Sequence, residues 1–184
     1  MAAYIISIDQ STQGTKALLF DETGTIVRRT DCAHRQIVNE KGWVSHDPEE
    51  IYRNVLTVVS KLLEGIDANC VVGVGISNQR ETTVAWNKIT GKPYGNAVVW
   101  QCARATKICE RESIVLMADA IQKKTGMNLS PYFPAAKLTW ILENEEGAKE
   151  AAGKHEICHG TMDSWLVYKL TGGKEYRTDY SNAS

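Results

Sequence analysis

Three short apolar segments at the start of the chain, separated by turns and followed by one helix, constrain its fold most. Residues 4–8, 15–20 and 25–30 have the β-branched and aromatic content of strands. The turns between them, residues 11–14 and 21–24, end in Gly14 and Gly24. We therefore expect the chain to open as an antiparallel meander.

A strong helix-start signal follows the meander and a loop around Gly42-Trp43. Asp47 is a good N-cap, Pro48 suits the first helical position, and Glu50 is placed to close a capping box. Apolar residues then recur at helical spacing as far as Gly65, which predicts an amphipathic helix. They are Ile51, Val55, Val58, Val59, Leu62 and Leu63.

The rest of the chain alternates between strand and helix patterns. The continuous apolar run 71–76 predicts a buried strand, and residues 82–86 predict another that turns at 88–93. Residues 103–124 are expected to be mostly helical, with a break near Ser113 and a stop at Gly126; residues 135–143 and 162–170 predict further helices. The pattern by itself indicates an α/β fold with no repeat or linker.

Composition excludes several classes of protein. The net charge is −1, from 21 basic and 22 acidic residues, so nothing favours nucleic acid or an anionic membrane as partner. No apolar run approaches the ~20 residues of a membrane span, and the N-terminus lacks the features of a signal peptide. Five irregularly spaced cysteines without a C-x-x-C motif indicate reduced thiols in the cytoplasm.

An adjacent charged pair, Arg80-Glu81, follows shortly after the apolar run 71–76. Such a pair is costly at the end of a buried strand unless it meets a polar ligand or another charge. Arginine offers five donors and glutamate only acceptors, so together they can hold a small molecule with several hydroxyls. From these residues alone, a salt bridge at the rim of a domain explains the pair equally well.

The sequence signals for a nucleotide site and for a metal site are weaker than that of the Arg80-Glu81 pair. The chain has no G-x-x-x-x-G-K-[ST] motif, and its partial glycine fingerprint at residues 73–78 leads into a strand, which disfavours a dinucleotide site. The first hairpin, residues 9–16, can bind phosphate through backbone N–H groups and the hydroxyls of Ser11, Thr12 and Thr15, but composition alone favours an ordinary polar hairpin. His155, Cys158 and His159 supply three ligands where structural zinc normally has four.

Residues 76–83, ISNQRETT, resemble the substrate-binding segment of glycerol kinases, which belong to the FGGY family of carbohydrate kinases. The likeness continues in order along the whole chain. It includes residues 6–12 (ISIDQST), 98–102 (VVWQC), 131–142 (PYF and KLTWIL), 160–166 (GTMDSWL) and 178–184 (TDYSNAS). We interpret Asp163 and Asp179 in the last two segments as helix-start and loop carboxylates.

The resemblance implies a ribonuclease-H-like fold of the actin and sugar kinase superfamily. Residues 1–184 would be the incomplete N-terminal FGGY kinase domain, a fragment that is inactive alone. The implied activity of the full-length enzyme is ATP-dependent phosphorylation of glycerol to glycerol 3-phosphate, with its catalytic Asp base further along the chain. The cofactors would be ATP and Mg²⁺, and the partner a small-molecule polyol; whether the enzyme is a homo-oligomer stays open.

The resemblance also assigns residues to roles. Substrate binding falls on Arg80, Glu81, Trp100 and Tyr132. Phosphate contacts fall on Thr12, Gln13, Gly14 and Lys16, with Asp9 holding Mg²⁺ through water. Lys16 stands where many glycerol kinases have arginine, and it keeps the charge without the bidentate fork.

At two places that bear on the choice of substrate, the sequence departs from the usual glycerol kinase pattern. Ala103 stands where an arginine is usual, and residues 134–136 (PAA) replace small polar residues. One alternative is therefore a kinase for another polyol or a ketose, such as erythritol or a xylulose-like sugar. The other is a non-catalytic sensor or scaffold that kept the fold.

Overall fold

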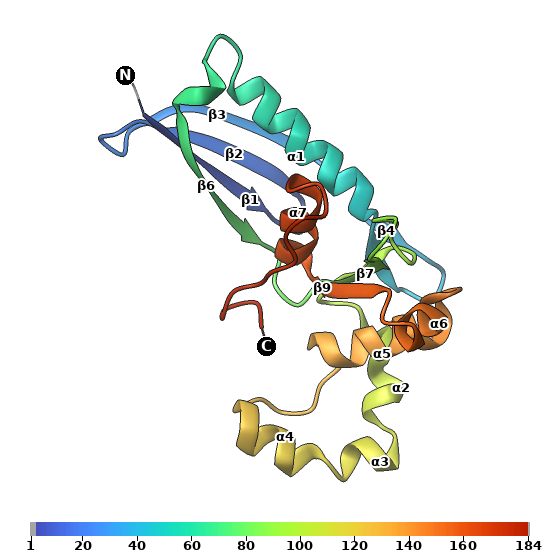
Figure 1. Cartoon of the computed structure of the whole chain (residues 1–184). Coiled ribbons are helices and arrows are strands. Elements are labelled where there is room, and N and C mark those ends of the chain that lie inside the picture. Colours follow the sequence, from blue (N-terminus) through green and yellow to red (C-terminus); the bar gives the residue numbers. More distant parts are fainter. Residues whose placement is uncertain (1–2, 184) are drawn as a thin grey trace. The chain divides into compact units, whose positions relative to one another are not determined.

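A computed structural model describes residues 3–183 and is shown in Figure 1. Its contacts divide the chain into two units. The first unit contains the described residues up to Gln36 together with Asp47–Gln79, and the second contains Ile37–His46 with the described residues from Arg80 on. Each unit mixes helix and sheet, so the predicted α/β class is confirmed. None of the described helices is long and apolar enough to cross a membrane.

The first unit is built on a four-stranded sheet of order β3-β2-β1-β6. The strands β1 (Tyr4–Gln10), β2 (Gly14–Phe20) and β3 (Ile26–Ala33) form the predicted antiparallel meander. β6 (Val71–Asn78), entered through the 3-10 helix η1 (Ala68–Cys70), pairs in parallel with β1. A parallel pair needs a long crossover connection, and in this unit it contains a helix.

That helix is α1 (Pro48–Leu62), which packs mainly on β2 and β3 (Figure 1). Asp47 caps it as predicted, accepting a hydrogen bond from the Glu49 N–H at 2.9 Å. The predicted capping box is wrong: Glu50 accepts instead from the Arg35 N–H, at 3.1 Å, because the loop before the helix brings that donor within reach. Four of the six predicted apolar residues are buried, Ile51, Val55, Val58 and Leu62, whereas Val59 and Leu63 are only half-buried.

The apolar run 71–76 forms a strand, but the expectation that this strand is buried is wrong. β6 is an outer strand of its sheet, and none of its residues is buried among those that the structure describes. Val72 is 69% exposed and Val74 55%. The physical reason is that α1 covers β2 and β3 and does not extend over this edge.

The second unit contains a five-stranded antiparallel sheet of order β4-β5-β8-β7-β9. Its longer strands are β7 (Thr83–Asn87), as predicted, and β9 (Ile157–Thr161). The remaining strands are the short β4 (Ile37–Val38), β5 (Val44–His46) and β8 (Ala97–Val98). β4 and β5 form a hairpin where the sequence predicts only a loop around Gly42-Trp43.

The second unit also contains a series of helices, of which α5, α6 and α7 contact its sheet. The region predicted as one broken helix consists of η2 (Ala103–Ala105), α2 (Thr106–Cys109), α3 (Glu112–Val115) and α4 (Ala118–Thr125). Ser113 lies inside α3, and Gly126 ends α4 with a φ of 77°. The helices α5 (Pro134–Asn144) and α7 (Met162–Leu170) follow the prediction, whereas α6 (Ala148–Gly153) was not predicted.

The core of the second unit joins the sheet to α5. A buried cluster links strand residues to helix residues; its members are Ala85, Val98, Cys102, Ile141 and Ala148. Beside it the Trp86 ring contacts the rings of Trp165 and Tyr168, each with centroids 5.3 Å away. This packing joins β7 and β8 to α5, α6 and α7 within one unit.

Candidate functional site

The hairpin between β1 and β2 in the first unit is the candidate phosphate loop. The Ser11 N–H and hydroxyl both donate to the Gly14 carbonyl, at 2.9 and 3.0 Å. Gln79, just after β6, donates from its backbone N–H to the Gln10 carbonyl at 2.7 Å and from its side chain to the Gln10 amide oxygen at 3.1 Å. The turn is therefore shaped by bonds within its own unit.

Gly14 is required at this hairpin by a close approach of two strands. A Cβ at this position would lie 2.7 Å from the Cys32 carbonyl oxygen of β3. The neighbouring Thr15 is fully buried, and its hydroxyl has no hydrogen-bond partner among the described residues. Since the Ser11 hydroxyl is engaged and Thr15 is buried, exposed Gln13, half-buried Thr12 and the backbone N–H groups are better placed for phosphate.

Asp9 and Lys16 face each other across the same hairpin. They are paired in register, and the Lys16 Nζ lies 3.7 Å from the Asp9 Oδ2, with side chains 45% and 41% exposed respectively. An exposed single carboxylate suits Mg²⁺, which usually keeps waters and phosphate oxygens as further ligands. No group of three or more His, Cys, Asp or Glu among the described residues could enclose a metal ion by itself.

Arg80 and Glu81 lie in the turn before β7 of the second unit. Glu81 is 6% exposed and has a φ of 66°, a left-handed conformation that is uncommon for a residue other than glycine. Its carbonyl accepts a hydrogen bond from the Thr83 hydroxyl at 3.2 Å. Arg80 is exposed, and no described residue forms an ion pair with its guanidinium. The pair thus combines a buried carboxylate with an accessible guanidinium.

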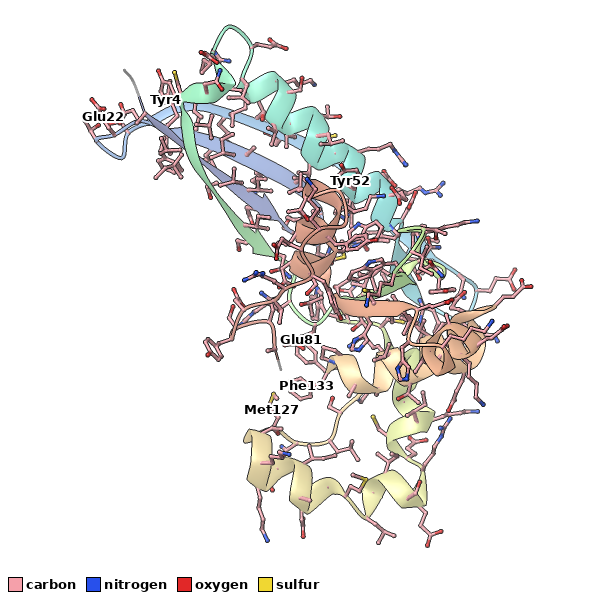
Figure 2. All side chains as sticks on the ribbon, viewed as in Figure 1. Tyr4, Glu22, Tyr52, Glu81, Met127 and Phe133 are labelled. Carbon is pink, nitrogen blue, oxygen red and sulfur yellow. The ribbon has the colours of Figure 1, made fainter. Side chains whose placement is uncertain are left out.

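Trp100 and Tyr132 come together in the second unit. Their ring centroids are 6.0 Å apart in an edge-on arrangement, and Tyr132 is 41% exposed. The backbone N–H of Trp100 donates to the Thr82 hydroxyl at 3.1 Å, which connects the Trp100 backbone to the segment that follows Glu81. Figure 2 labels Glu81 in the turn before β7 and Phe133, the residue after Tyr132, at the start of α5. Such an aromatic pair can form an apolar wall for a carbon skeleton.

Lys137 in α5 was not predicted as a functional residue. Its side chain is 0% exposed, and its Nζ donates to the Pro131 carbonyl at 2.9 Å and to the Tyr132 carbonyl. Burial lowers its pKa to about 8, while the charge of Glu81 acts in the opposite direction. One signal was present in the sequence: a lysine four residues before Ile141 shares the buried face of a short apolar helix.

The two aspartates of the C-terminal segments have structural contacts, consistent with the interpretation above. Asp163 lies in the first turn of α7 and accepts hydrogen bonds from the hydroxyls of Thr161 and, at 2.8 Å, Thr178. Hydrogen bonds from the side chains of Ser181 and Asn182 hold the pKa of Asp179 below its ordinary value.

Comparison with known sequences gives one family. A model described as the FGGY family of carbohydrate kinases, N-terminal domain, matches residues 4–184. Glycerol kinase 1 of Thermotoga maritima is 50% identical over 183 residues, which cover 98% of this chain and 37% of that protein. The chain thus spans little more than a third of the length of the curated relatives that it matches.

Solved structures give the same fold. The crystal structure of Plasmodium falciparum glycerol kinase with ADP matches with a TM-score of 0.89 at 36% identity, covering 99% of this chain and 37% of that one. Gluconate kinase from Lactobacillus acidophilus matches with a TM-score of 0.83 at 25% identity, covering 100% of this chain and 36% of that one. The expected ribonuclease-H-like fold is thereby confirmed.

Proposed function

Because this chain belongs to the FGGY family of carbohydrate kinases, we propose that the whole protein transfers the γ-phosphoryl group of ATP to glycerol, giving glycerol 3-phosphate. The observation that carries the proposal is the presence of all four candidate substrate residues in the second unit, with two of their rings in contact. These residues are Arg80, Glu81, Trp100 and Tyr132. The similarity to glycerol kinases supports glycerol over other polyols.

The chemistry of this group suits a small triol. The Glu81 carboxylate accepts hydrogen bonds from hydroxyls, and the Arg80 guanidinium donates them. The Trp100 and Tyr132 rings cover the carbon skeleton, and the Tyr132 hydroxyl adds a directional bond. Catalysis in such a site comes mainly from positioning the acceptor hydroxyl against the phosphate.

The phosphoryl donor would be bound by the first unit. We assign the phosphate contacts to Thr12, Gln13, Gly14 and Lys16, whose donors lie on the β1–β2 hairpin. Lys16 contributes one positive charge, and the exposed Asp9 would hold Mg²⁺ through water. The bound ion would supply charge neutralisation on the phosphates. The similarity to a glycerol kinase solved with ADP supports ATP as donor.

Membership of the FGGY family also suggests which part of the whole protein this chain forms. Residues 1–184 would act as the N-terminal domain of an FGGY kinase. A cytoplasmic location is supported by the five cysteines, none of which forms a disulfide within the described residues.

A substrate panel tests the choice of glycerol. The whole protein is assayed with MgATP and glycerol, dihydroxyacetone, erythritol, xylitol, xylulose or ribulose. We expect glycerol to have the highest kcat/KM, because an extra hydroxymethyl group must clash with the rings or leave a hydroxyl unpaired. Preference for a four- or five-carbon substrate would indicate the alternative polyol or ketose kinase and implicate Ala103 and residues 134–136. No turnover with any of them would favour a sensor or scaffold.

A further inference from the structure

We propose that Lys137 is a positioning residue of the polyol site, whose ammonium group holds the Tyr132 segment in the arrangement that binds the substrate. This inference rests on the proposed function, because it concerns the same site. It assigns a role to a side chain that would not itself touch the polyol.

The first observation is the hydrogen bonding of the Tyr132 segment. The Lys137 Nζ donates to the carbonyls of Pro131 and Tyr132, the two residues that precede the N-cap of α5, Phe133. The same Nζ lies 5.7 Å from the centroid of the Tyr132 ring. These contacts fix the backbone that carries Tyr132, and with it the edge-on contact between Tyr132 and Trp100.

The second observation is the charge around the ammonium group. Glu81 is the acidic side chain that acts on Lys137, from the turn before β7. The other titratable groups that act on it are two thiols, Cys102 just before η2 and Cys109 in α2. Both thiols are buried, and burial raises the pKa of Cys109. The negative charge of Glu81 therefore favours the protonated form of Lys137, against the larger effect of burial.

Packing alone does not explain a lysine at this position. A buried ammonium group loses its hydration, whereas an apolar side chain of similar volume would fill the same space without that cost. What the lysine adds is a set of directed donors and a charge, and the donors are aimed at the segment that carries the candidate substrate residue Tyr132. Strongly perturbed titratable groups of this kind cluster at functional sites.

The test compares three variants of the whole protein. Lys137→Met keeps the length and removes the charge, Lys137→Arg keeps the charge, and Lys154→Met removes an exposed lysine that pairs with Glu150. We expect Lys137→Met to raise the KM for glycerol at least about tenfold while the KM for MgATP stays within about twofold. Lys137→Arg should recover part of the loss, and Lys154→Met should match the wild type. An unchanged KM for glycerol, or an equal rise in both KM values, would overturn the proposal.

The pH profile of the wild-type enzyme is a second test, and it does not depend on whether a variant folds. At saturating MgATP, kcat/KM for glycerol should fall as the pH rises through about 8, where Lys137 loses its proton. The kcat/KM for MgATP, measured at saturating glycerol, should not fall over the same pH range. A glycerol profile that is flat to about pH 9.5 would overturn the proposal. If another polyol proves the better substrate, glycerol fails as the function, and the same comparison with that polyol still tests Lys137.

Discussion

At Glu81 and Lys137 the second unit departs from what stability alone would favour. Glu81 is buried with a φ of 66°, and Lys137 carries a side chain with 0% exposure. A non-glycine residue in such a backbone conformation costs on the order of 1–3 kcal/mol. Glu81 is itself a candidate substrate residue and Lys137 contacts another, Tyr132; strain and burial of charge are expected to serve binding at such a site.

The first prediction concerns the stability of the chain as a function of pH. The pKa of Lys137 is about 8 in the folded chain against an ordinary value of 10.5, so the unfolded chain binds more protons between these two values. The free energy of unfolding of the wild type should therefore rise relative to that of Lys137→Met between about pH 8 and pH 10.5. The total gain is on the order of 3 kcal/mol.

Chemical denaturation of both chains at several pH values measures this difference. Lys154→Met is the control, because the exposed pair with Glu150 raises the pKa of Lys154 rather than lowering it. A constant difference between wild type and Lys137→Met from pH 8 to pH 10.5 would show that the lysine titrates normally in the folded chain.

The residues of the candidate site differ in how well they could be predicted from the sequence. Arg80, Glu81, Trp100 and Tyr132 were proposed from motif similarity, and whether they bind substrate stays a prediction. For Lys137 the spacing to Ile141 signalled a buried position, but its hydrogen bonds to the Pro131 and Tyr132 carbonyls could not be predicted, because they depend on how that segment folds over the start of α5. The left-handed backbone of Glu81 likewise has no sequence signal, since glycine or asparagine would be the usual residue there.

At the scale of elements, the β1–β2 hairpin depends on the space at Gly14. A methyl group there would lie 2.7 Å from the Cys32 carbonyl oxygen, which belongs to the backbone of β3 and cannot rotate away. Gly14→Ala should therefore destabilise the chain by about 1–3 kcal/mol. In the whole protein it should also raise the KM for MgATP, because the candidate phosphate loop is displaced.

Gly73→Ala in β6 of the same sheet is the matched control. A Cβ on Gly73 would meet nothing within 4 Å, and its φ is not in the left-handed region. The free energies of unfolding of the two variants separate the effect of crowding at Gly14 from the general effect of replacing a glycine by alanine. If Gly14→Ala proved as stable as Gly73→Ala, the close approach of β2 and β3 would not constrain the hairpin.

Elements with strong local signals were predicted well. The meander, α1, β7, α5 and α7 follow from alternation, helical spacing and caps. The short strands β4, β5 and β8 were missed, because two or three residues give no periodic pattern, and the pairing of β5 with β8 joins segments that are distant in sequence. The burial of β6 was predicted wrongly for a related reason: an apolar run does not reveal which strand lies at the edge of a sheet.

At the scale of the whole molecule, the two candidate sites belong to different units. Asp9, Lys16 and the rest of the phosphate loop lie in the first unit, and the four candidate polyol residues lie in the second. Each unit has its own sheet and its own buried residues. A substitution in one unit should therefore change the use of one substrate and leave the other nearly unaffected.

Initial-rate kinetics of the whole protein, with glycerol and MgATP varied independently, tests this division most directly. Arg80→Ala should lower kcat/KM for glycerol at least about tenfold, or about 1.4 kcal/mol, with the KM for MgATP within about twofold of wild type. Asp9→Asn should weaken Mg²⁺-dependent turnover and leave the KM for glycerol nearly unchanged. A loss below about tenfold for Arg80→Ala, or an equal loss of glycerol and MgATP affinity in Asp9→Asn, would contradict the account.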